Sequence, residues 1–372
     1  MAPGASNHKI LIAMSGGVDS SVCAAIAKET GVMCAGATMK LFGNELLGMP
    51  INSTCCSIDD VDDAKSVCKT LSIPHYTINC KKEFMTSVIE PFYASYHTGQ
   101  TPNPCIACNR YLKFDTLIHK AKQMGFDMLL TGHYACIKKQ GKRYYLKRGR
   151  DTHKDQSYVL HTLTQDQLSF LDFPLFSLEK YQVREIAERY NLVVARKKES
   201  QDICFIPDGD VKNFLKRFET YNKINDESKN NKTGEIVDIH ENVLGHHNGI
   251  SGFTIGQRKG LGISVGRPMY VVSINPRNNK IVVGNKDSLI KHDIIASNFN
   301  WIYPVKKTGK SFRCTCKIRY NMQNIECECH VQSPDIVSVH IEGGVSAPAL
   351  GQSLVLYDKD YVIGGGYIRK VK

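Results

Sequence analysis

The sequence contains no apolar run that approaches the roughly 20 residues a membrane-spanning helix needs. Its first strongly apolar segment, Lys9–Met14, stops just before the pair Gly16–Gly17, so the N-terminus lacks the long apolar stretch that directs a chain to a membrane. Internal repeats and low-complexity tracts are absent as well. These absences predict a globular protein of the cytoplasm with no membrane partner.

Acidic residues are in short supply relative to basic ones. The 372 residues include 36 Asp and Glu but 48 Lys and Arg, which gives a formal net charge of +12. Such an excess favours a polyanionic partner, with nucleic acid ahead of an anionic membrane. A chain of this length predicts two or three domains. The 14 cysteines of a cytosolic chain should be mostly reduced thiols, with a minority serving catalysis or metal binding.

Two common nucleotide-binding signatures are missing near the N-terminus. The segment Ser15–Ser21 (SGGVDSS) follows an apolar strand, yet it has neither the lysine of a Walker loop nor a GxGxxG pattern. It does have two glycines that let the backbone approach a phosphate, three serine hydroxyls and the unsatisfied N–H groups of a helix start. Asp19 at that helix start could hold magnesium. The segment therefore predicts a pyrophosphate-binding turn.

Strands and helices alternate through the N-terminal part of the chain, which indicates a parallel sheet covered by helices. Strands are expected at Lys9–Met14, Val32–Leu41, His75–Cys80 and Asp127–Leu130, and helices at Asp19–Thr30, Ile58–Leu71, Lys82–His97, Tyr111–Met124, Tyr181–Leu192 and Val211–Phe218. Beyond the polar stretch Tyr221–Lys232, short strands without helices indicate small β domains or a barrel. These strands are expected at Met269–Ile274, Lys280–Val283, Phe312–Arg319, Ile325–Val331, Ile336–His340, Ser353–Leu356 and Tyr361–Arg369.

Two separately placed cysteines are candidates for chemistry. Cys108 ends a C-x-x-C pattern in the run Thr101–Asn109 (TPNPCIACN), beside Arg110 and an expected helix start, so we expect a lowered thiol pKa. A C-x-x-C pattern by itself fits a metal ligand, a redox pair or a coincidence. Cys204 lies in the apolar run ICFIP, where a core cysteine is the simplest interpretation on its own.

A basic hairpin is predicted over Cys136–Arg150, with Gly141 near its turn. Seven Lys and Arg, two tyrosines and no acid fall within it, so phosphate contacts from the basic residues and stacking of Tyr144 and Tyr145 on a base would suit RNA. The alternative is a solvated basic hairpin with one tyrosine packed inward.

Two C-x-C pairs flank an expected turn near the C-terminus. Strand alternation puts Cys314 and Cys316 on the same face of the first strand. It likewise puts Cys327 and Cys329 on the same face of the second strand. A hairpin that faces the core explains this pattern without metal, whereas a zinc site remains an alternative that the spacing fits poorly.

Several motifs together carry a resemblance to a known family. The segment Ser15–Ser21 resembles the PP-loop of ATP pyrophosphatases, enzymes that split ATP between its α and β phosphates. The ordered set of motifs resembles that of the tRNA-specific 2-thiouridylases over nearly the whole chain, from about residue 8 to residue 370. That set comprises Ser15–Ser21, Thr101–Asn109, Thr131–Ala135 (TGHYA), Asp155–Leu160 (DQSYVL), Ser200–Pro207 (SQDICFIP), Gly256–Gly260 (GQRKG), Lys317–Tyr320 (KIRY) and Gly351–Ser353 (GQS).

The resemblance implies a fold and a reaction. The fold would be α/β, with a PP-loop (adenine nucleotide α-hydrolase-like) domain over 1–212, a small central domain over 213–282 and a C-terminal β-barrel over 283–372. The reaction would be adenylation of the C2 oxygen of the wobble uridine by ATP, followed by sulfur transfer. Cys204 would carry a persulfide, Cys108 would be the nucleophile, and a Cys108–Cys204 disulfide would remain.

The resemblance also implies ligands and partners. ATP and Mg²⁺ are expected at Ala13, Met14, Ser15, Gly16, Gly17, Val18, Asp19, Ser20, Met39 and Gly132, with Asp19 also part of the catalytic set. The tRNA contacts would be Asn103, Pro104, Cys105, His133, Lys154, Asp155, Gln156, Arg319, Tyr320 and Gln352. The expected partners are a persulfide relay protein and the anticodon arms of tRNAs for Lys, Glu and Gln.

Three alternatives stay open. The thiols of Cys105, Cys108 and Cys204 could instead hold an iron–sulfur cluster. A ligase that forms an amide or argininosuccinate would use the same nucleotide chemistry without paired thiols. A tRNA-binding factor could hold ATP and transfer no sulfur.

Overall fold

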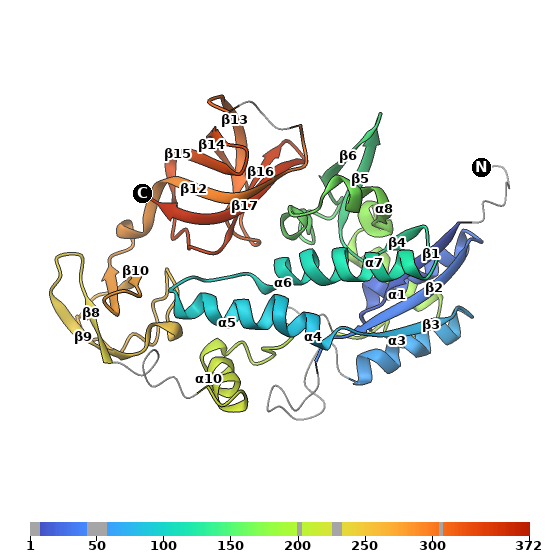
Figure 1. The fold of residues 1–372 in the computed structure, drawn as a ribbon, viewed down its shortest axis with the longest axis horizontal. Helices are drawn as coiled ribbons and strands as arrows, with labels where there is room; N and C mark the ends of the chain where they lie inside the picture. The colour runs from blue at the N-terminus through green and yellow to red at the C-terminus, as the bar shows by residue number, and fades with distance from the viewer. Residues whose placement is uncertain (1–7, 43–57, 199–202, 225–232, 305–307) are drawn as a thin grey trace. The chain divides into compact units, whose positions relative to one another are not determined.

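The computed structural model describes residues 8–42, 58–198, 203–224, 233–304 and 308–372 (Figure 1). Residues 200–202 of the motif Ser200–Pro207 and residues 225–232 of the polar stretch Tyr221–Lys232 lie outside this part of the chain. The chain divides into two units. The first comprises Met1–Val88, Cys105–Asp210 and Asp360–Val362, and the second comprises Ile89–Pro104, Val211–Lys359 and Ile363–Lys372.

A parallel sheet forms the centre of the first unit. Its strands are β1 (Lys9–Ala13), β2 (Met33–Lys40), β3 (His75–Asn79), β4 (Met128–Leu130) and β7 (Leu171–Asp172). They lie in the order β3-β2-β1-β4-β7, and every neighbouring pair runs parallel. The α/β class predicted from the sequence is confirmed, although β7 was not foreseen because it is only two residues long.

Three helices build the core on one face of this sheet. They are α1 (Val18–Glu29), α3 (Ile58–Thr70) and α9 (Lys180–Arg189), and each contributes residues to a shared apolar cluster with β1. Ile12 of β1 belongs to this cluster, while its neighbour Leu11 is equally buried without joining it, as strand alternation requires. Each fully buried aliphatic side chain of this kind stabilises the fold by about 1.5–3 kcal/mol.

Two helical stretches are interrupted by π-helical segments. The first runs through α4 (Lys81–Phe84), a π segment (Met85–Ile89) and α5 (Glu90–His97), where the sequence predicted one helix. The second runs through α6 (Pro104–Ala107), a π segment (Cys108–Thr116) and α7 (Leu117–Gln123). It begins earlier than the predicted start at Tyr111, because Pro104 suits the first turn of a helix. Such π segments are frequent at functional sites.

The basic hairpin is formed as predicted. Its strands are β5 (Ala135–Gln140) and β6 (Arg143–Arg148), and Gly141 adopts φ +60° at the turn between them. Short elements follow: a 3₁₀ turn at Ser157–Leu160, α8 (Gln165–Phe170) and a 3₁₀ turn at Pro174–Ser177. Helix α8 starts at a capping box in which Thr164 and Gln167 satisfy each other's backbone N–H groups.

The second unit contains a small sheet with a core of its own. After α10 (Val211–Tyr221) come β8 (Thr233–Val237), β9 (Val243–Asn248), β10 (Tyr270–Asn275) and β11 (Lys280–Gly284). They lie in the order β10-β11-β8-β9 over a core that includes Ile236, Val271 and Ile281. The sequence predicted β10 and β11 but not β8 and β9, which are short and half-exposed.

The C-terminal strands close into a barrel. They are β12 (Ile290–Trp301), β13 (Ser311–Lys317), β14 (Ile325–Ser333), β15 (Ile336–Ser346), β16 (Ser353–Asp358) and β17 (Tyr361–Val371). Their order is β12-β15-β14-β13-β16-β17, and a further pairing of β12 with β17 closes the ring. The sequence missed β12 because polar residues such as His292 and Asp293 interrupt its apolar alternation.

Within the described residues, no helix combines the length and the apolar character that crossing a membrane would require.

Candidate nucleotide and thiol site

The strand order places a ligand site at the carboxyl ends of β1 and β4. The chain moves from β1 to β2 on one side and returns to β4 on the other, so the direction of the strand order reverses between these two strands. Ligands of open parallel sheets bind outside such a reversal point. The loop Ser15–Gly17 leaves β1 there, and Gly132 follows β4. A Cβ atom on Gly132 would lie 2.8 Å from the backbone of Asp19 and Ser20, so only glycine lets the two loops approach this closely.

The predicted phosphate turn is shaped by its own serines. Gly16 adopts φ +73°, a conformation that favours glycine. The hydroxyls of Ser20 and Ser21 donate to the carbonyl of Gly17 at 3.0 and 2.9 Å, and the N–H of Ser15 donates to Ser20 Oγ at 3.2 Å. The sequence suggested these hydroxyls as phosphate donors, but Ser20 and Ser21 are buried and serve the loop instead. The donors left for a phosphate are the first N–H groups of α1, which no side chain caps, and the hydroxyl of exposed Ser15.

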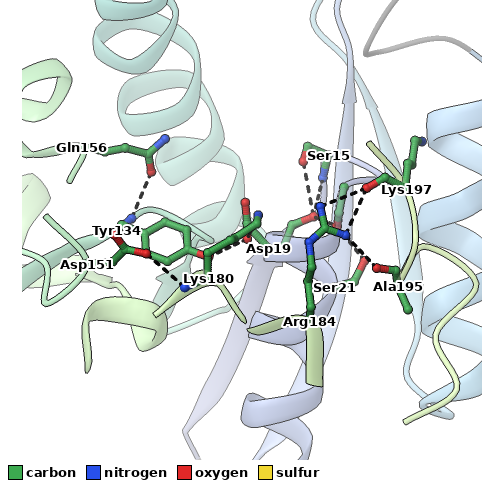
Figure 2. A network of polar contacts seen from close by, with 12 residues as sticks. Ser15, Asp19, Ser21, Tyr134, Asp151, Gln156, Lys180, Arg184, Ala195 and Lys197 are labelled. Carbon is green, nitrogen blue, oxygen red and sulfur yellow. Dashed lines mark hydrogen bonds and ion pairs between the residues drawn. The ribbon is translucent and has the colours of Figure 1, made fainter. Parts of the chain in front are cut away.

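Asp19 is held by a lysine and a tyrosine that the sequence did not single out. Its Oδ1 accepts from Lys180 Nζ at 2.6 Å and from Tyr134 Oη at 2.8 Å (Figure 2). Backbone contacts position both donors: Gln156 Oε1 accepts from Tyr134 N, and Asp151 Oδ2 accepts from Lys180 N, each at 3.0 Å. The Asp19 side chain remains 33% exposed, so its carboxylate fits a magnesium ligand by charge and access.

A second lysine ties the loop to α3. Lys197 Nζ donates to the carbonyl of Gly16 at 3.1 Å and to Asp60 Oδ1 and Asp63 Oδ2 at 2.6 Å each. Burial by itself lowers the pKa of Lys197, but hydrogen bonds and charge from the two aspartates outweigh burial and raise that pKa. Arg184 donates to the carbonyls of Ala195 and Lys197, which fixes the segment that carries this lysine (Figure 2).

The expected thiolate at Cys108 is wrong for this structure. The thiol is 8% exposed, and burial, opposed by Lys113 and aided by Cys105, raises its pKa to about 11. The cause is the early helix start: Cys108 lies one turn inside the helical stretch that begins at Pro104, away from the helix N-terminus. The pKa of the neighbouring buried thiol Cys80 is also raised to about 11. Burial is the largest cause, the charge of Glu83 comes next, and Cys108 adds a smaller contribution.

The other two thiols of the predicted set are more accessible. Cys105 is exposed and Cys204 is half-buried in a turn. The turn is anchored by Phe205, whose ring packs edge-on against Phe84 with centroids 5.8 Å apart. In the part of the chain that the structure describes, no group of three or more His, Cys, Asp or Glu side chains is arranged to hold a metal ion. The iron–sulfur alternative at Cys105, Cys108 and Cys204 therefore gains no support from the geometry.

Predicted ligand residues of the first unit fall at the strand ends and under the hairpin. Ala13 ends β1 with Met14 next to it, and half-buried Met39 lies near the end of β2. His133 is buried between Phe114 and Phe173, bonds Thr131 Oγ1 through Nδ1 at 2.7 Å, and has a pKa held well below its usual value by burial.

One of the predicted tRNA contacts in this unit, Asp155, has a charged partner. Asp155 is buried 3.8 Å from the Arg148 guanidinium, and Lys154 beside it is half-buried. Whether His133, Lys154, Asp155 and Gln156 touch RNA stays a prediction.

Three predicted tRNA residues of the second unit, Gln352, Arg319 and Tyr320, take part in hydrogen bonds between a side chain and a backbone carbonyl. Gln352 Nε2 donates to the carbonyl of Thr101 at 2.7 Å, just before Asn103 and Pro104. The guanidinium of Arg319 donates to the carbonyls of Ser346 and, at 2.7 Å, Ala347. Lys317 Nζ donates to the carbonyl of Tyr320 at 3.4 Å. Their assignment to tRNA also stays a prediction.

Basic residues of the hairpin form ion pairs with carboxylates at the end where its strands join the domain, and they are exposed near the turn. Lys147 pairs with Asp360 at 3.4 Å, and Arg150 with Glu179 at 3.7 Å. Lys138, Lys139 and Lys142 are exposed, and no carboxylate within the described ranges forms an ion pair with them. Tyr145 packs edge-on against Tyr361, whereas Tyr144 lies under Lys139 Nζ, 5.4 Å from its ring centre. The predicted alternative of one inward-packed tyrosine fits Tyr145.

A glycine-rich turn at the reversal point of a parallel sheet, followed by a small β domain and a barrel, defines a nucleotide-binding protein of the PP-loop class. Family models match along the whole of this arrangement. They are described as the tRNA methyl transferase HUP domain at residues 8–208, the tRNA methyl transferase PRC-barrel domain at 223–285 and the aminomethyltransferase beta-barrel domain at 291–368. The predicted order of an α/β domain, a central domain and a β-barrel is confirmed.

Curated relatives match over nearly their full length. The tRNA-specific 2-thiouridylase MnmA 1 of Caldanaerobacter subterraneus subsp. tengcongensis is 44% identical over 98% of this chain and 98% of its own. The tRNA-specific 2-thiouridylase MnmA of Clostridioides difficile is 42% identical over 98% of this chain and 99% of its own. The chain therefore belongs to the tRNA-specific 2-thiouridylase family. The predicted enzyme class, a tRNA-uridine 2-sulfurtransferase, is the class of this family.

Solved structures give a weaker likeness. The structure of NMN synthetase from Francisella tularensis shares 18% identity and covers 60% of this chain and 87% of its own, with a TM-score of 0.33.

Proposed function

We propose that this protein uses ATP to replace the C2 oxygen of the wobble uridine of tRNA by sulfur. The observation that carries the proposal is the 44% identity, over 98% of both chains, with a relative named as a tRNA-specific 2-thiouridylase. The uncapped N-terminus of α1 at the strand reversal point supports it, because that is where a phosphate group is held in such folds.

The first step is adenylation of the uridine. The C2 oxygen attacks the α-phosphorus of ATP, the bond to the β-phosphate breaks, and pyrophosphate leaves. Backbone N–H groups of Val18, Asp19 and Ser20 would bind the departing pyrophosphate. Asp19 would hold Mg²⁺, which neutralises phosphate charge when bound. Lys180 and Tyr134 fix the Asp19 carboxylate for that role.

The second step is sulfur transfer. The terminal sulfur of a Cys204 persulfide attacks C2 and expels AMP, which leaves the base joined to Cys204 through two sulfurs. The Cys108 thiol loses its proton to solvent and its sulfur attacks the Cys204 sulfur; the sulfur–sulfur bond to the base breaks, and the electron pair stays on the base as 2-thiouridine. The product pair is a Cys108–Cys204 disulfide, so an external thiol must return two electrons and two protons before the next turnover.

Partners and domain limits are part of the same proposal. The persulfide would come from a relay protein, the substrates would be tRNAs for Lys, Glu and Gln, and the reaction would take place in the cytoplasm. The domain limits of 1–212, 213–282 and 283–372 likewise remain predictions.

The test is a single-turnover reaction of the purified protein with unmodified tRNA, ATP, Mg²⁺ and a persulfide donor. We expect 2-thiouridine in the nuclease digest by mass spectrometry, together with one AMP and one pyrophosphate for each base modified. The Cys108→Ser and Cys204→Ser variants should lose 2-thiouridine while still binding ATP. The matched control Cys136→Ser, a half-buried thiol outside the predicted set, should retain it.

Two outcomes would replace the proposal. Full turnover of ATP by both thiol variants, with no 2-thiouridine formed by any of the proteins, would favour the ligase-type chemistry that needs no paired cysteines. Binding of tRNA and ATP without release of AMP would leave a binding factor.

A further inference from the structure

The barrel core contains a group of cysteines for which the proposed reaction has no use. Cys314 and Cys316 lie on β13, and Cys327 and Cys329 lie on the adjacent antiparallel strand β14. All four belong to the apolar core of the barrel, with exposures of 8%, 0%, 6% and 0% respectively. The prediction that both C-x-C pairs face the core is confirmed.

The strand register makes one pair special. Cys314 lies directly opposite Cys327, whereas Cys316 faces Ile325 and Cys329 faces Phe312. Directly opposite residues of an antiparallel pair have Cβ atoms about 4.5–5.5 Å apart, so their side chains meet across the strands. The sulfurs of Cys314 and Cys327 are 3.6 Å apart, within thiol–thiol hydrogen-bond distance. Rotation of the two side chains, with a small approach of the strands that brings the Cβ atoms to about 3.5–4.5 Å, would bring the sulfurs to bonding distance.

The charge distribution within the group singles out Cys327. Hydrogen bonds donated by Cys314 and Cys316 stabilise the Cys327 thiolate and hold its pKa below the usual thiol range in spite of burial. Cys329, which lacks such donors, has a pKa raised to about 12, chiefly by burial. A thiolate beside a thiol is the arrangement in which one sulfur reacts first and the other resolves the product.

Metal binding is the competing use of clustered thiols. It needs at least three donors that converge on one point, whereas Cys316 lies opposite Ile325 and Cys329 lies opposite Phe312, so only Cys314 and Cys327 face each other directly. Among the residues that the structure describes, no convergent set of three or more donors is found. The geometry therefore favours a pairwise reaction of the two opposed sulfurs.

We propose that Cys314 and Cys327 form a redox-active dithiol whose oxidant is a small hydroperoxide. The Cys327 sulfur attacks the peroxide oxygen, the O–O bond breaks, and a sulfenic acid forms with release of hydroxide. The Cys314 sulfur then attacks Cys327, water leaves, and a disulfide remains. In total two thiols and one hydrogen peroxide give one disulfide and two waters. A thiol reductant reverses the change.

The disulfide would join residues 13 positions apart across the base of the loop 318–324. It would close a loop in the unfolded chain and so stabilise the folded hairpin. The site is independent of the ATP and tRNA chemistry, because none of its residues belongs to the proposed reaction. Only small oxidants should reach it, since both sulfurs are more than nine-tenths buried.

The experiment uses the full-length Cys108→Ser/Cys204→Ser protein, so that a disulfide of the proposed reaction cannot contribute. Folded protein is treated with hydrogen peroxide, alkylated and digested, and the peptides are mapped by mass spectrometry. We expect a loss of two hydrogen masses in a cross-linked peptide pair that joins Cys314 to Cys327. Dithiothreitol should restore both free thiols, and the oxidised protein should unfold at a higher temperature than the reduced one.

A matched pair of variants gives the control. In the same background Cys327→Ser should abolish the cross-link, whereas Cys329→Ser, two positions along the same face of β14, should retain it. Four outcomes would overturn the proposal: all four barrel thiols stay reduced, the cross-link maps to other cysteines, dithiothreitol fails to reopen it, or Cys329→Ser abolishes it as well. If Cys327→Ser does not fold, the peptide map of the parent protein decides by itself.

Discussion

The ammonium of Lys197 lies 3.1 Å from the carbonyl oxygen of Gly16, 181 positions earlier in the chain. The same ammonium bonds Asp60 and Asp63 of α3. A Cβ atom on Gly16 would lie 2.4 Å from the carbonyl of Asp60, so loop and helix are in direct contact. Lys197 therefore holds three segments together: the phosphate turn, α3 and the stretch that leads to Cys204.

We predict that Lys197→Met weakens ATP binding without removing the thiol chemistry. The substitution removes the positive charge between the carboxylates of Asp60 and Asp63 beside the loop, and their repulsion shifts Gly16. A lost charge-assisted contact at this partly exposed site should cost about 1 kcal/mol, or roughly a fivefold rise in the ATP dissociation constant. Isothermal titration calorimetry measures it.

The matched control is Lys198→Met, because Lys198 is the exposed next residue. Lys197→Arg should restore part of the affinity, since the positive charge remains. Equal affinities in the Lys197→Met and Lys198→Met variants would show that the loop does not depend on this contact.

The contact of Tyr134 with Asp19 leads to a second prediction. Tyr134→Phe removes only the hydroxyl that donates to Asp19 at 2.8 Å, leaving Lys180 as the remaining donor to that oxygen among the described contacts. A neutral-to-charged hydrogen bond contributes about 1.5–3 kcal/mol, so the rate of pyrophosphate release should fall roughly tenfold to a hundredfold. Asp19→Asn, which removes the carboxylate charge itself, should lower the rate further.

A pyrophosphate-release assay under single-turnover conditions measures both variants. Tyr190→Phe serves as the control, because the Tyr190 hydroxyl bonds Glu29, outside the phosphate turn. A Tyr134→Phe rate equal to that of the control would mean that Asp19 needs no support from this hydroxyl.

Local sequence patterns predicted much of the fold and part of the site. Three short-range signals in the sequence are confirmed by the structure. They are the strand Lys9–Met14 followed by glycines, the hairpin around Gly141 and the alternating C-x-C pairs. Lys180 and Lys197 gave no such signal, because the side-chain partner of Lys180 lies 161 positions away and those of Lys197 lie 134 or more positions away, so only the fold brings them together. Tyr134 could have been noticed, since it lies within the TGHYA motif.

The misjudged pKa of Cys108 has a similar origin. The sequence placed the helix start after Cys108, where a helix N-terminus would favour a thiolate. The structure starts the helix at Pro104, so the thiol is carried into the core, and burial outweighs the nearby Lys113. Element boundaries are set by tertiary packing as much as by local residues, and a shift of one turn reverses the electrostatic conclusion.

The raised pKa of Cys108 predicts how its reactivity depends on pH. A pKa of about 11, against an ordinary value of 9.0, means that the neutral thiol dominates at pH 7. Below that pKa the thiolate fraction grows tenfold per pH unit, so the alkylation rate of Cys108 by iodoacetamide should rise about tenfold per unit from pH 7 to pH 10. Lys113→Met should lower the rate, because Lys113 favours the thiolate.

Peptide mass spectrometry follows the alkylation of Cys108 in the free protein, and exposed Cys105 gives an internal comparison in the same digest. Cys105 should react faster at every pH below 9, because water and reagent reach it. A Cys108 rate that levels off near pH 8 would contradict the buried thiol.

The exposed tip of the basic hairpin leads to the last prediction. Replacement of Lys138, Lys139 and Lys142 by Gln removes the charges that no described carboxylate neutralises. Each lost phosphate contact should flatten the salt dependence of tRNA binding by about 0.7–0.9, so the slope of log K against log salt should change by about 2–3. The control replaces Lys28, Lys69 and Lys122, exposed lysines on helices, and changes the net charge by the same amount. Filter binding across a salt series distinguishes direct phosphate contacts from a net-charge effect. Direct contacts would change the slope only for the hairpin variant, whereas a net-charge effect would weaken tRNA binding equally in both variants.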